Sequence, residues 1–175
     1  MKVLAFAGSS SKNSINKQLV TYATKLLEEA HVEILDLNDY EIPLFSEDKE
    51  KELGQPALAK EFLSKIGESD ALIISFAEHN GSYSAAYKNL FDWCSRINTK
   101  VFQNKSLVLL ATSPGPGGGS NVLAAANKSA SFFHGNVKAT LSIPSFYENF
   151  DMENKSLKNE EIQTQLTMAL KELLT

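Results

Sequence analysis

Five short apolar runs alternate with segments of helical periodicity along this chain, and the alternation restricts the folds it can adopt. The runs lie at 3–7, 32–37, 71–76, 107–111 and 137–143, and a continuous run such as 3–7 is typical of a strand buried on both faces. The helical spacing predicts helices at about 14–29, 56–67, 85–94, 122–133 and 162–174. Strands and helices in this order predict an α/β fold, with a parallel sheet covered by helices on both faces. The alternating run 32–37 is expected nearer an edge of that sheet.

Length and charge set further limits. With 175 residues, the chain is expected to form a single domain, 1–175. The net charge is −4 and the Lys and Arg residues are scattered, which does not indicate a nucleic-acid partner. No run approaches the roughly 20 apolar residues needed to span a bilayer, so we expect no membrane segment. Cys94 is the single cysteine, which excludes an internal disulfide and fits a cytoplasmic location.

Three loops of unusual composition follow predicted strands, at 8–16, 77–84 and 112–120. In open parallel sheets, ligands bind at the carboxyl ends of the strands. The loops are therefore expected to meet around one ligand.

The first loop, GSSSKNSIN, precedes a predicted helix for which Ser14 is the expected N-cap. Free N–H groups and the positive end of the helix dipole suit a phosphate there, and serine hydroxyls add donors. The loop is neither a P-loop nor a GxGxxG fingerprint. A plain Ser- and Asn-rich turn that caps a helix is the alternative.

The other two loops suit a flat ligand. Asn80-Gly81 predicts a tight turn that aims backbone groups at a ring edge, although a simple strand-to-helix turn is possible. The loop SPGPGGGSN allows the backbone to approach a ligand closely. His79 has no evident partner, so it is not assigned as an acid or base, and no metal-ligand motif is present. Trp93 is expected in the core.

Together, these segments resemble the NAD(P)H-dependent FMN reductase family, which has a flavodoxin-like fold. The family's phosphate loop, GSxRxxSxN, is similar to the segment with Gly8, Ser9, Ser14 and Asn16. Its second signature, PEYNxSxPxxLKNxxDW, is matched at Glu78, Asn80, Ser82, Lys88, Asn89, Asp92 and Trp93. The third loop is similar over 113–119. The chain departs from the family at Ser11 (Arg in the family), Ala77 (Pro) and His79 (Tyr).

The resemblance implies a three-layer sandwich with strand order 2-1-3-4-5, FMN as cofactor and NAD(P)H as co-substrate. It assigns the FMN phosphate to Ser9, Ser11, Ser14, Ile15 and Asn16. It assigns one side of the flavin ring, mainly through the backbone, to Glu78, His79, Asn80 and Gly81. It assigns the other edge to Ser113, Pro114, Gly115, Gly117 and Gly118.

The expected function is an oxidoreductase that transfers hydride through flavin to a quinone, an azo compound, free flavin or a metal oxyanion. No catalytic side chain is assigned, because the flavin carries the chemistry. A flavodoxin-type electron carrier and a flavin-free regulatory or interaction domain remain as alternatives. The resemblance also implies a homodimer or homotetramer, with 85–94 as a candidate interface. Phe146, Tyr147 and Phe150 are expected either to cover a site across that interface or to pack locally.

Overall fold

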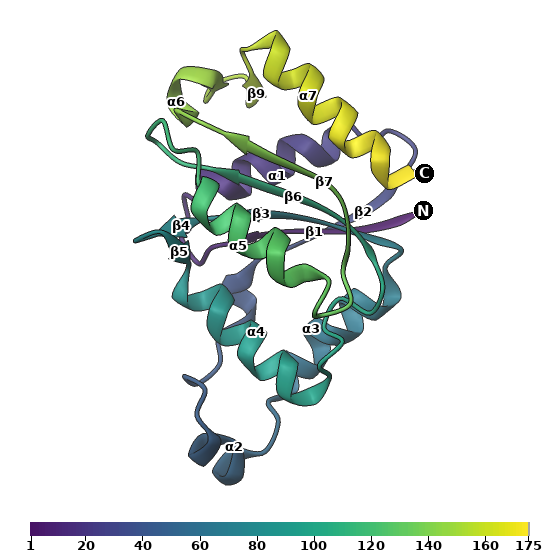
Figure 1. The fold of residues 1–175 in the computed structure, drawn as a ribbon, viewed down its shortest axis with the longest axis vertical. Coiled ribbons are helices and arrows are strands. Elements are labelled where there is room, and N and C mark those ends of the chain that lie inside the picture. Colours follow the sequence, from purple (N-terminus) through teal and green to yellow (C-terminus); the bar gives the residue numbers. More distant parts are fainter. Residues whose placement is uncertain (175) are drawn as a thin grey trace.

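The computed structural model describes residues 1–174, and its centre is a five-stranded parallel sheet between two layers of helices (Figure 1). The strand order is β2-β1-β3-β6-β7. These strands are β1 (Lys2–Gly8), β2 (His31–Leu35), β3 (Ala71–Phe76), β6 (Ser106–Thr112) and β7 (Asn136–Ile143). They correspond to the five predicted strands, so the flavodoxin-like order 2-1-3-4-5 is confirmed.

Five helices cover the two faces of the sheet. On one face lie α1 (Ile15–Lys25) and α7 (Glu160–Lys171). On the other lie α3 (Ala57–Glu68), α4 (Ala85–Ile97) and α5 (Ser120–Ala130), as Figure 1 shows. Each connection between parallel strands crosses through a helix, as parallel pairing requires.

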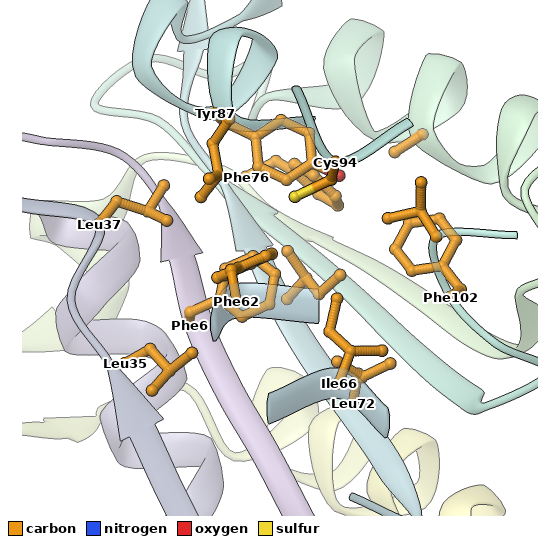
Figure 2. Packing of buried hydrophobic residues seen from close by; sticks show 14 of the residues in the cluster. Phe6, Leu35, Leu37, Phe62, Ile66, Leu72, Phe76, Tyr87, Cys94 and Phe102 are labelled. Atoms are coloured by element: carbon orange, nitrogen blue, oxygen red, sulfur yellow. The ribbon is translucent and has the colours of Figure 1, made fainter. Parts of the chain in front are cut away.

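The central strands are buried on both faces, and their side chains alternate between two cores. In β1, Leu4 and Phe6 join the cluster under α3, α4 and α5, whereas Val3 and Ala5 join the cluster under α1 and α7. Figure 2 shows Phe6 beside Phe62 of α3; their ring centroids are 5.2 Å apart. This alternation explains why the central strands are continuously apolar, whereas β2, at the edge, is mostly exposed.

Polar side chains place two boundaries earlier than the apolar pattern predicted. The second strand ends at Leu35 rather than 37, because the Asp36 carboxylate accepts the Asn38 N–H (3.0 Å) and caps the 3-10 helix η1 (Leu37–Tyr40). The first helix ends at Lys25 rather than 29. Two acidic residues follow, at 28 and 29, where the negative end of the helix dipole disfavours them.

A further helix, α2 (Glu47–Leu53), forms between β2 and α3, where the sequence analysis assigned no element. The Ser46 side chain accepts the Lys49 N–H (3.1 Å), and acidic residues in the first turn favour the helix dipole. No residue of α2 is buried, and the helix projects away from the body in Figure 1.

Several short elements were not predicted, because they are too short to show periodicity. They are the hairpin β4 (Glu78–His79) and β5 (Ser82–Tyr83), α6 (Phe146–Asn149), β8 (Phe150–Asp151) and β9 (Ser156–Leu157). The predicted C-terminal helix, about 162–174, is α7 followed by the 3-10 helix η2 (Glu172–Leu174). Within residues 1–174, no helix has the length and apolar character needed to cross a membrane.

Candidate functional site

The three predicted loops lie at one edge of the sheet. They follow β1, β3 and β6, which are adjacent parallel strands, so their carboxyl ends point the same way. In Figure 1 this edge is marked by the β4–β5 hairpin and the start of α1. The expected convergence of the loops is therefore what the topology produces.

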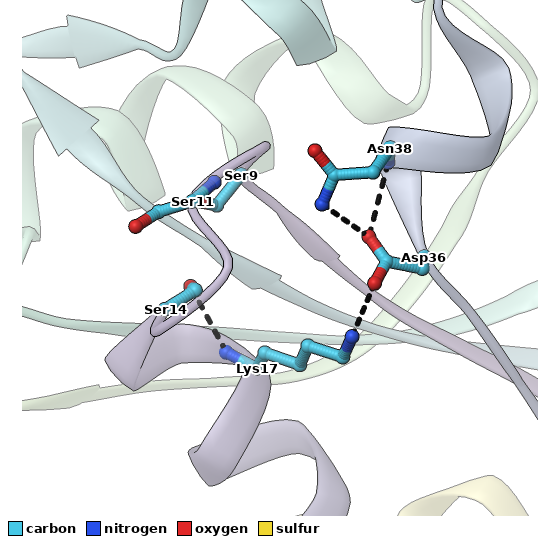
Figure 3. A network of polar contacts seen from close by, with 6 residues as sticks. All are labelled: Ser9, Ser11, Ser14, Lys17, Asp36 and Asn38. Atoms are coloured by element: carbon cyan, nitrogen blue, oxygen red, sulfur yellow. Dashed lines mark hydrogen bonds and ion pairs between the residues drawn. The ribbon is translucent and has the colours of Figure 1, made fainter.

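The first loop is held in shape by its own serines. The Ser9 hydroxyl accepts the Ser11 N–H (3.2 Å), and the Ser14 hydroxyl accepts the Lys17 N–H (3.2 Å) as the predicted N-cap of α1. Figure 3 shows these serines along the turn. The N–H groups of Ile15 and Asn16 open the helix, and such first-turn groups have no partner within a helix. The Ser11 side chain is exposed.

The Asn16 side chain connects this loop to the middle of the sheet. Its Oδ1 accepts the Ser75 hydroxyl (2.8 Å) and the Thr112 N–H (3.0 Å), and its Nδ2 donates to the Thr112 carbonyl (3.1 Å). The residue is 2% exposed. The side chain thus serves as a brace between loops, and only the backbone N–H of Asn16 is left for the predicted phosphate contact.

The second loop forms a tight hairpin. Asn80 and Gly81 have positive φ (52° and 74°) and form the two-residue turn that their sequence predicted. His79 is exposed at the end of β4. The Ser84 hydroxyl, at the N-cap of α4, donates to the Gly8 carbonyl (2.7 Å) and accepts the Tyr87 N–H (3.2 Å). Ser84 thus connects the second loop to the first.

Glu78 connects the second loop to the third. Its Oε2 accepts the Val122 N–H (2.8 Å), and its Oε1 accepts the Asn121 amide (3.2 Å). Gly119, the N-cap of α5, has no side chain that could accept these N–H groups and cap the helix. The Glu78 carboxylate therefore caps α5, and its backbone remains for the predicted contact with the ring.

The third loop requires glycine. A Cβ on Gly118 (φ 59°) would lie 2.4 Å from the Ser142 hydroxyl, whereas a Cβ on Gly115 or Gly117 would meet no atom within 4 Å. The Ser113 hydroxyl donates to the Gly115 carbonyl (3.1 Å). The backbone at 115 and 117 is thus open for close approach by a flat ligand.

An ion pair lies beside the first loop, where Lys17 of α1 contacts Asp36 after β2 (Figure 3). The hydrogen bond from Lys17, together with those from Asn38, holds the pKa of Asp36 below its usual value. The pair fixes the start of α1 relative to β2.

Two residues of the second signature have roles that sequence reasoning missed. The Asn89 amide accepts the Phe45 N–H (2.8 Å) and donates to the carbonyls of Ile42 and Pro43 (both 3.1 Å). Trp93 is fully buried, as predicted, and its indole N–H donates to the Pro43 carbonyl (2.7 Å). These bonds hold segment 42–45 against α4, and no local pattern signals them because about 45 residues separate the partners.

The proposed aromatic cover is wrong for two of its three members. Phe146 and Phe150 are almost completely buried, with ring centroids 4.6 Å apart, in the core beneath α1 and α7. Tyr147 is 56% exposed. The alternative of local packing is what the structure shows for the two phenylalanines, because the sheet and α7 leave an apolar space that they fill.

Two further observations concern the chemistry available. Cys94 is buried, and burial raises the pKa of its thiol to about 12, so it is not a reactive thiolate. Among residues 1–174, no group of three His, Cys, Asp or Glu side chains is placed to hold a metal ion.

The donors at this edge fit FMN. The start of α1 offers N–H groups, uncharged hydroxyls and a positive dipole end, which suit a phosphate. The Asn80-Gly81 turn and the open backbone at Gly115 and Gly117 suit the edges of a flat ring.

Comparison with known proteins decides the family. The family model described as NADPH-dependent FMN reductase matches residues 1–147. The chain belongs to this family. Membership confirms the predicted oxidoreductase class, FMN as the cofactor and NAD(P)H as the co-substrate.

The chain is similar to two curated proteins in sequence and to one solved structure in fold. An uncharacterized protein of Mycoplasma pneumoniae is 31% identical over 158 residues, covering 87% of this chain and 92% of that protein. An NADPH:quinone oxidoreductase of Arabidopsis thaliana is 32% identical over 123 residues, 68% of this chain and 61% of that protein. In structure, the flavoenzyme NAD(P)H:(acceptor) oxidoreductase of Paracoccus denitrificans matches with a TM-score of 0.75 at 22% identity, covering 99% of this chain and 94% of that one. The matched segment thus spans less than two thirds of the plant enzyme.

Proposed function

We propose that this FMN reductase family member passes hydride from NAD(P)H, by way of bound FMN, to a small acceptor such as a quinone, an azo compound, free flavin or a metal oxyanion. The observation that carries the proposal is the bracing of three loops at one sheet edge by Asn16, Ser84 and Glu78. The whole chain, 1–175, acts as one FMN-binding domain.

The chain's own groups would hold the cofactor by its two ends. The N–H groups of Ile15 and Asn16, with the hydroxyls of Ser9, Ser11 and Ser14, donate to the phosphate. Each serine hydroxyl that accepts a backbone N–H still has its own proton to donate.

The ring is held mainly by backbone. Residues 78–81 line one side, with the hairpin turn fixing their direction, and Ser113, Pro114, Gly115, Gly117 and Gly118 line the other edge. Fixed backbone donors facing the ring stabilise negative charge that develops there, without moving during the reaction. No side-chain acid or base is assigned.

Anaerobic absorbance titration of the FMN-loaded protein with NADPH and with NADH tests the function. Bleaching of the bound flavin, followed by recovery of its absorbance when a quinone is added, is the expected result. Tight FMN binding without bleaching by either nucleotide would favour the electron-carrier alternative. Failure to bind FMN would overturn the proposal.

A charge substitution in the first loop tests the phosphate site. Because Ser11 is exposed, Ser11→Asp should spare the braces yet repel a phosphate. FMN affinity should fall at least about tenfold, with riboflavin affinity unchanged. Thr164→Asp, on exposed α7, makes the same charge change elsewhere and should alter neither affinity. If Ser11→Asp lowers the affinity for FMN and for riboflavin equally, the assignment of the phosphate to this loop is wrong.

We also propose a homodimer, or a homotetramer built from two such pairs, with α4 and α5 at the interface. A cavity of about 240 Å³ lies between these helices, lined by the rings of Tyr83, Tyr87, Phe91 and Phe133, among others. Phe132, next to it, is 78% exposed. A second copy would cover this apolar surface, in line with the predicted interface at 85–94. We expect the protein in the cytoplasm, where its unpaired Cys94 stays reduced.

A further inference from the structure

A second concave surface lies along the outer side of α1, on the other side of the sheet from the cavity between α4 and α5. It has a volume of about 400 Å³, and its walls are the end of the first loop, α1 and the turn between β8 and β9. Four of the side chains that line it are lysines, and none is acidic: Lys12, Lys17, Lys25 and Lys155.

Helical geometry explains why these lysines share one surface. The groove residues on α1 and its N-cap occupy positions 14, 17, 18, 21, 22 and 25, which are spaced by three or four and fall on one helix face. The helix has 11 residues, so this face extends about 16 Å from the first loop. Lys12 lies at its near end, and Lys155 faces it from the β8–β9 turn.

Most of this positive charge is uncompensated. Lys17 is paired with Asp36, but Lys12, Lys25 and Lys155 form no ion pair with any residue from 1 to 174. The chain as a whole carries a net charge of −4, so a groove with lysines and no carboxylate does not follow from overall composition. A concave wall of one charge sign concentrates the field and attracts ions of the opposite sign.

The groove adjoins the proposed flavin site without coinciding with it. Ser14 belongs to both, whereas Ile15 and Asn16, whose N–H groups are proposed to hold the flavin phosphate, do not line the groove. The groove also lies on the α1 side of the sheet, away from the proposed dimer interface on α4 and α5. It therefore stays accessible when a second copy binds.

We infer that this groove binds the 2′-phosphate of the adenosine half of NADPH and thereby gives the protein a preference for NADPH over NADH. The inference rests on the proposed function, because it assigns a role to the co-substrate of that reaction. NADPH and NADH differ only in this phosphate monoester, which carries close to two negative charges at neutral pH. Three unpaired lysines and the hydroxyl of Thr21 supply both the charge and the hydrogen-bond donors that it requires.

The test compares two adenosine phosphates in a binding experiment that needs no turnover. Calorimetric titration of the FMN-loaded protein should show adenosine 2′,5′-bisphosphate binding more tightly than adenosine 5′-monophosphate, with a difference that shrinks as salt is raised. In the double variant Lys12→Ala/Lys155→Ala, the ratio of the dissociation constants of the 5′-monophosphate and the 2′,5′-bisphosphate should fall at least about tenfold. The matched control, Lys60→Ala/Lys128→Ala, removes two exposed lysines from α3 and α5 and should leave it unchanged.

Steady-state kinetics supply the second arm. In the groove variant, KM for NADPH should rise at least about tenfold while KM for NADH and the affinity for FMN stay the same. Equal binding of the two adenosine phosphates to the unmodified protein would overturn the inference. So would a loss of FMN affinity without a change in nucleotide preference, because the groove would then serve the flavin phosphate. If neither nucleotide reduces the flavin, the proposed function fails, whereas the titration still decides what the groove binds.

Discussion

Asn16 is the residue on which the arrangement of the three loops depends most. Its buried amide satisfies the Ser75 hydroxyl and both backbone groups of Thr112, a residue 96 positions away. Asn16→Ala would leave three buried polar groups without partners, at about 1 to 3 kcal/mol for each one left unsatisfied. We therefore expect a loss of at least about 3 kcal/mol in the free energy of unfolding, measured by urea denaturation.

Ser75→Ala is the matched control for that substitution. It removes one hydroxyl and leaves Asn16 its bonds to Thr112, so the expected loss is about 1 kcal/mol. If Asn16→Ala and Ser75→Ala cost the same, the bracing role assigned to the amide would be wrong.

Asp36 gives the molecule a defined response to acid. Its pKa in the folded protein is lowered, mainly by the hydrogen bond from Lys17, so folding favours the charged form. The stability from this pair is fully present above the unfolded pKa of about 4, and it is lost as pH falls through the lower folded pKa. Asp36→Asn should therefore lower the unfolding free energy at pH 7 by up to about 1 kcal/mol, the range for a partly exposed pair.

Denaturation at a series of pH values from 7 to 2 measures this effect. The difference between Asp36→Asn and the unmodified protein should shrink steadily toward the acid end. Asp39→Asn, an exposed acid of the same 3-10 helix, is the control. A difference that stays constant down to pH 2 would mean that the charge of Asp36 does not matter.

At the scale of elements, two helix caps of the same residue type have different consequences. Ser84 begins α4, and its hydroxyl also donates to the Gly8 carbonyl, whereas Ser46 begins α2, which has no buried residue. Ser84→Ala should lower global stability by about 2 kcal/mol, from a lost cap and a lost buried hydrogen bond. Ser46→Ala should change global stability by less than about 0.5 kcal/mol, yet speed hydrogen exchange in 47–53 about fivefold.

Amide exchange followed by mass spectrometry distinguishes the two cases. Peptides from α2 should exchange first in the unmodified protein, because none of its residues is buried and its ion pair with the body, Glu50 to Arg96 of α4, lies at the surface. Slow exchange in α2, comparable with that of β3, would contradict this view.

The elements that could be predicted are those whose pattern comes from the core. The strands β1, β3 and β6 are buried on both faces, so their composition alone marks them. By contrast, α2 forms through a cap and charges rather than an apolar face, and the Asn80-Gly81 hairpin has only two residues in each strand. Periodicity carries no information about either.

At the scale of the whole molecule, the aromatic cavity between α4 and α5 predicts self-association. Light scattering at micromolar concentration should give a mass of at least twice that of the 19.2 kDa chain. Phe132→Asp places a charge on the exposed ring beside the cavity and should weaken association at least about tenfold. Met168 lies on α7, on the other face of the sheet, and is 63% exposed. The control Met168→Asp should therefore leave association unchanged. A monomeric mass for the unmodified protein would refute the interface.

The position of the site followed from topology, whereas its internal connections did not. Loops after adjacent parallel strands must meet, so 8–16, 77–84 and 112–120 could be grouped from the sequence. The bonds of Asn16 and Glu78 could not, since their partners lie 96 and 44 positions away. Both residues were predicted to contact a ligand, and both side chains instead connect the loops to one another.

Those supporting bonds have a consequence for the cofactor-free protein. Asn16, Ser84 and Glu78 fix the loops through contacts within the chain, so the binding edge does not need its ligand in order to form. Newly made chains would therefore persist as a protease-resistant pool when flavin is scarce. They would become active at once when its supply recovers, without any further synthesis.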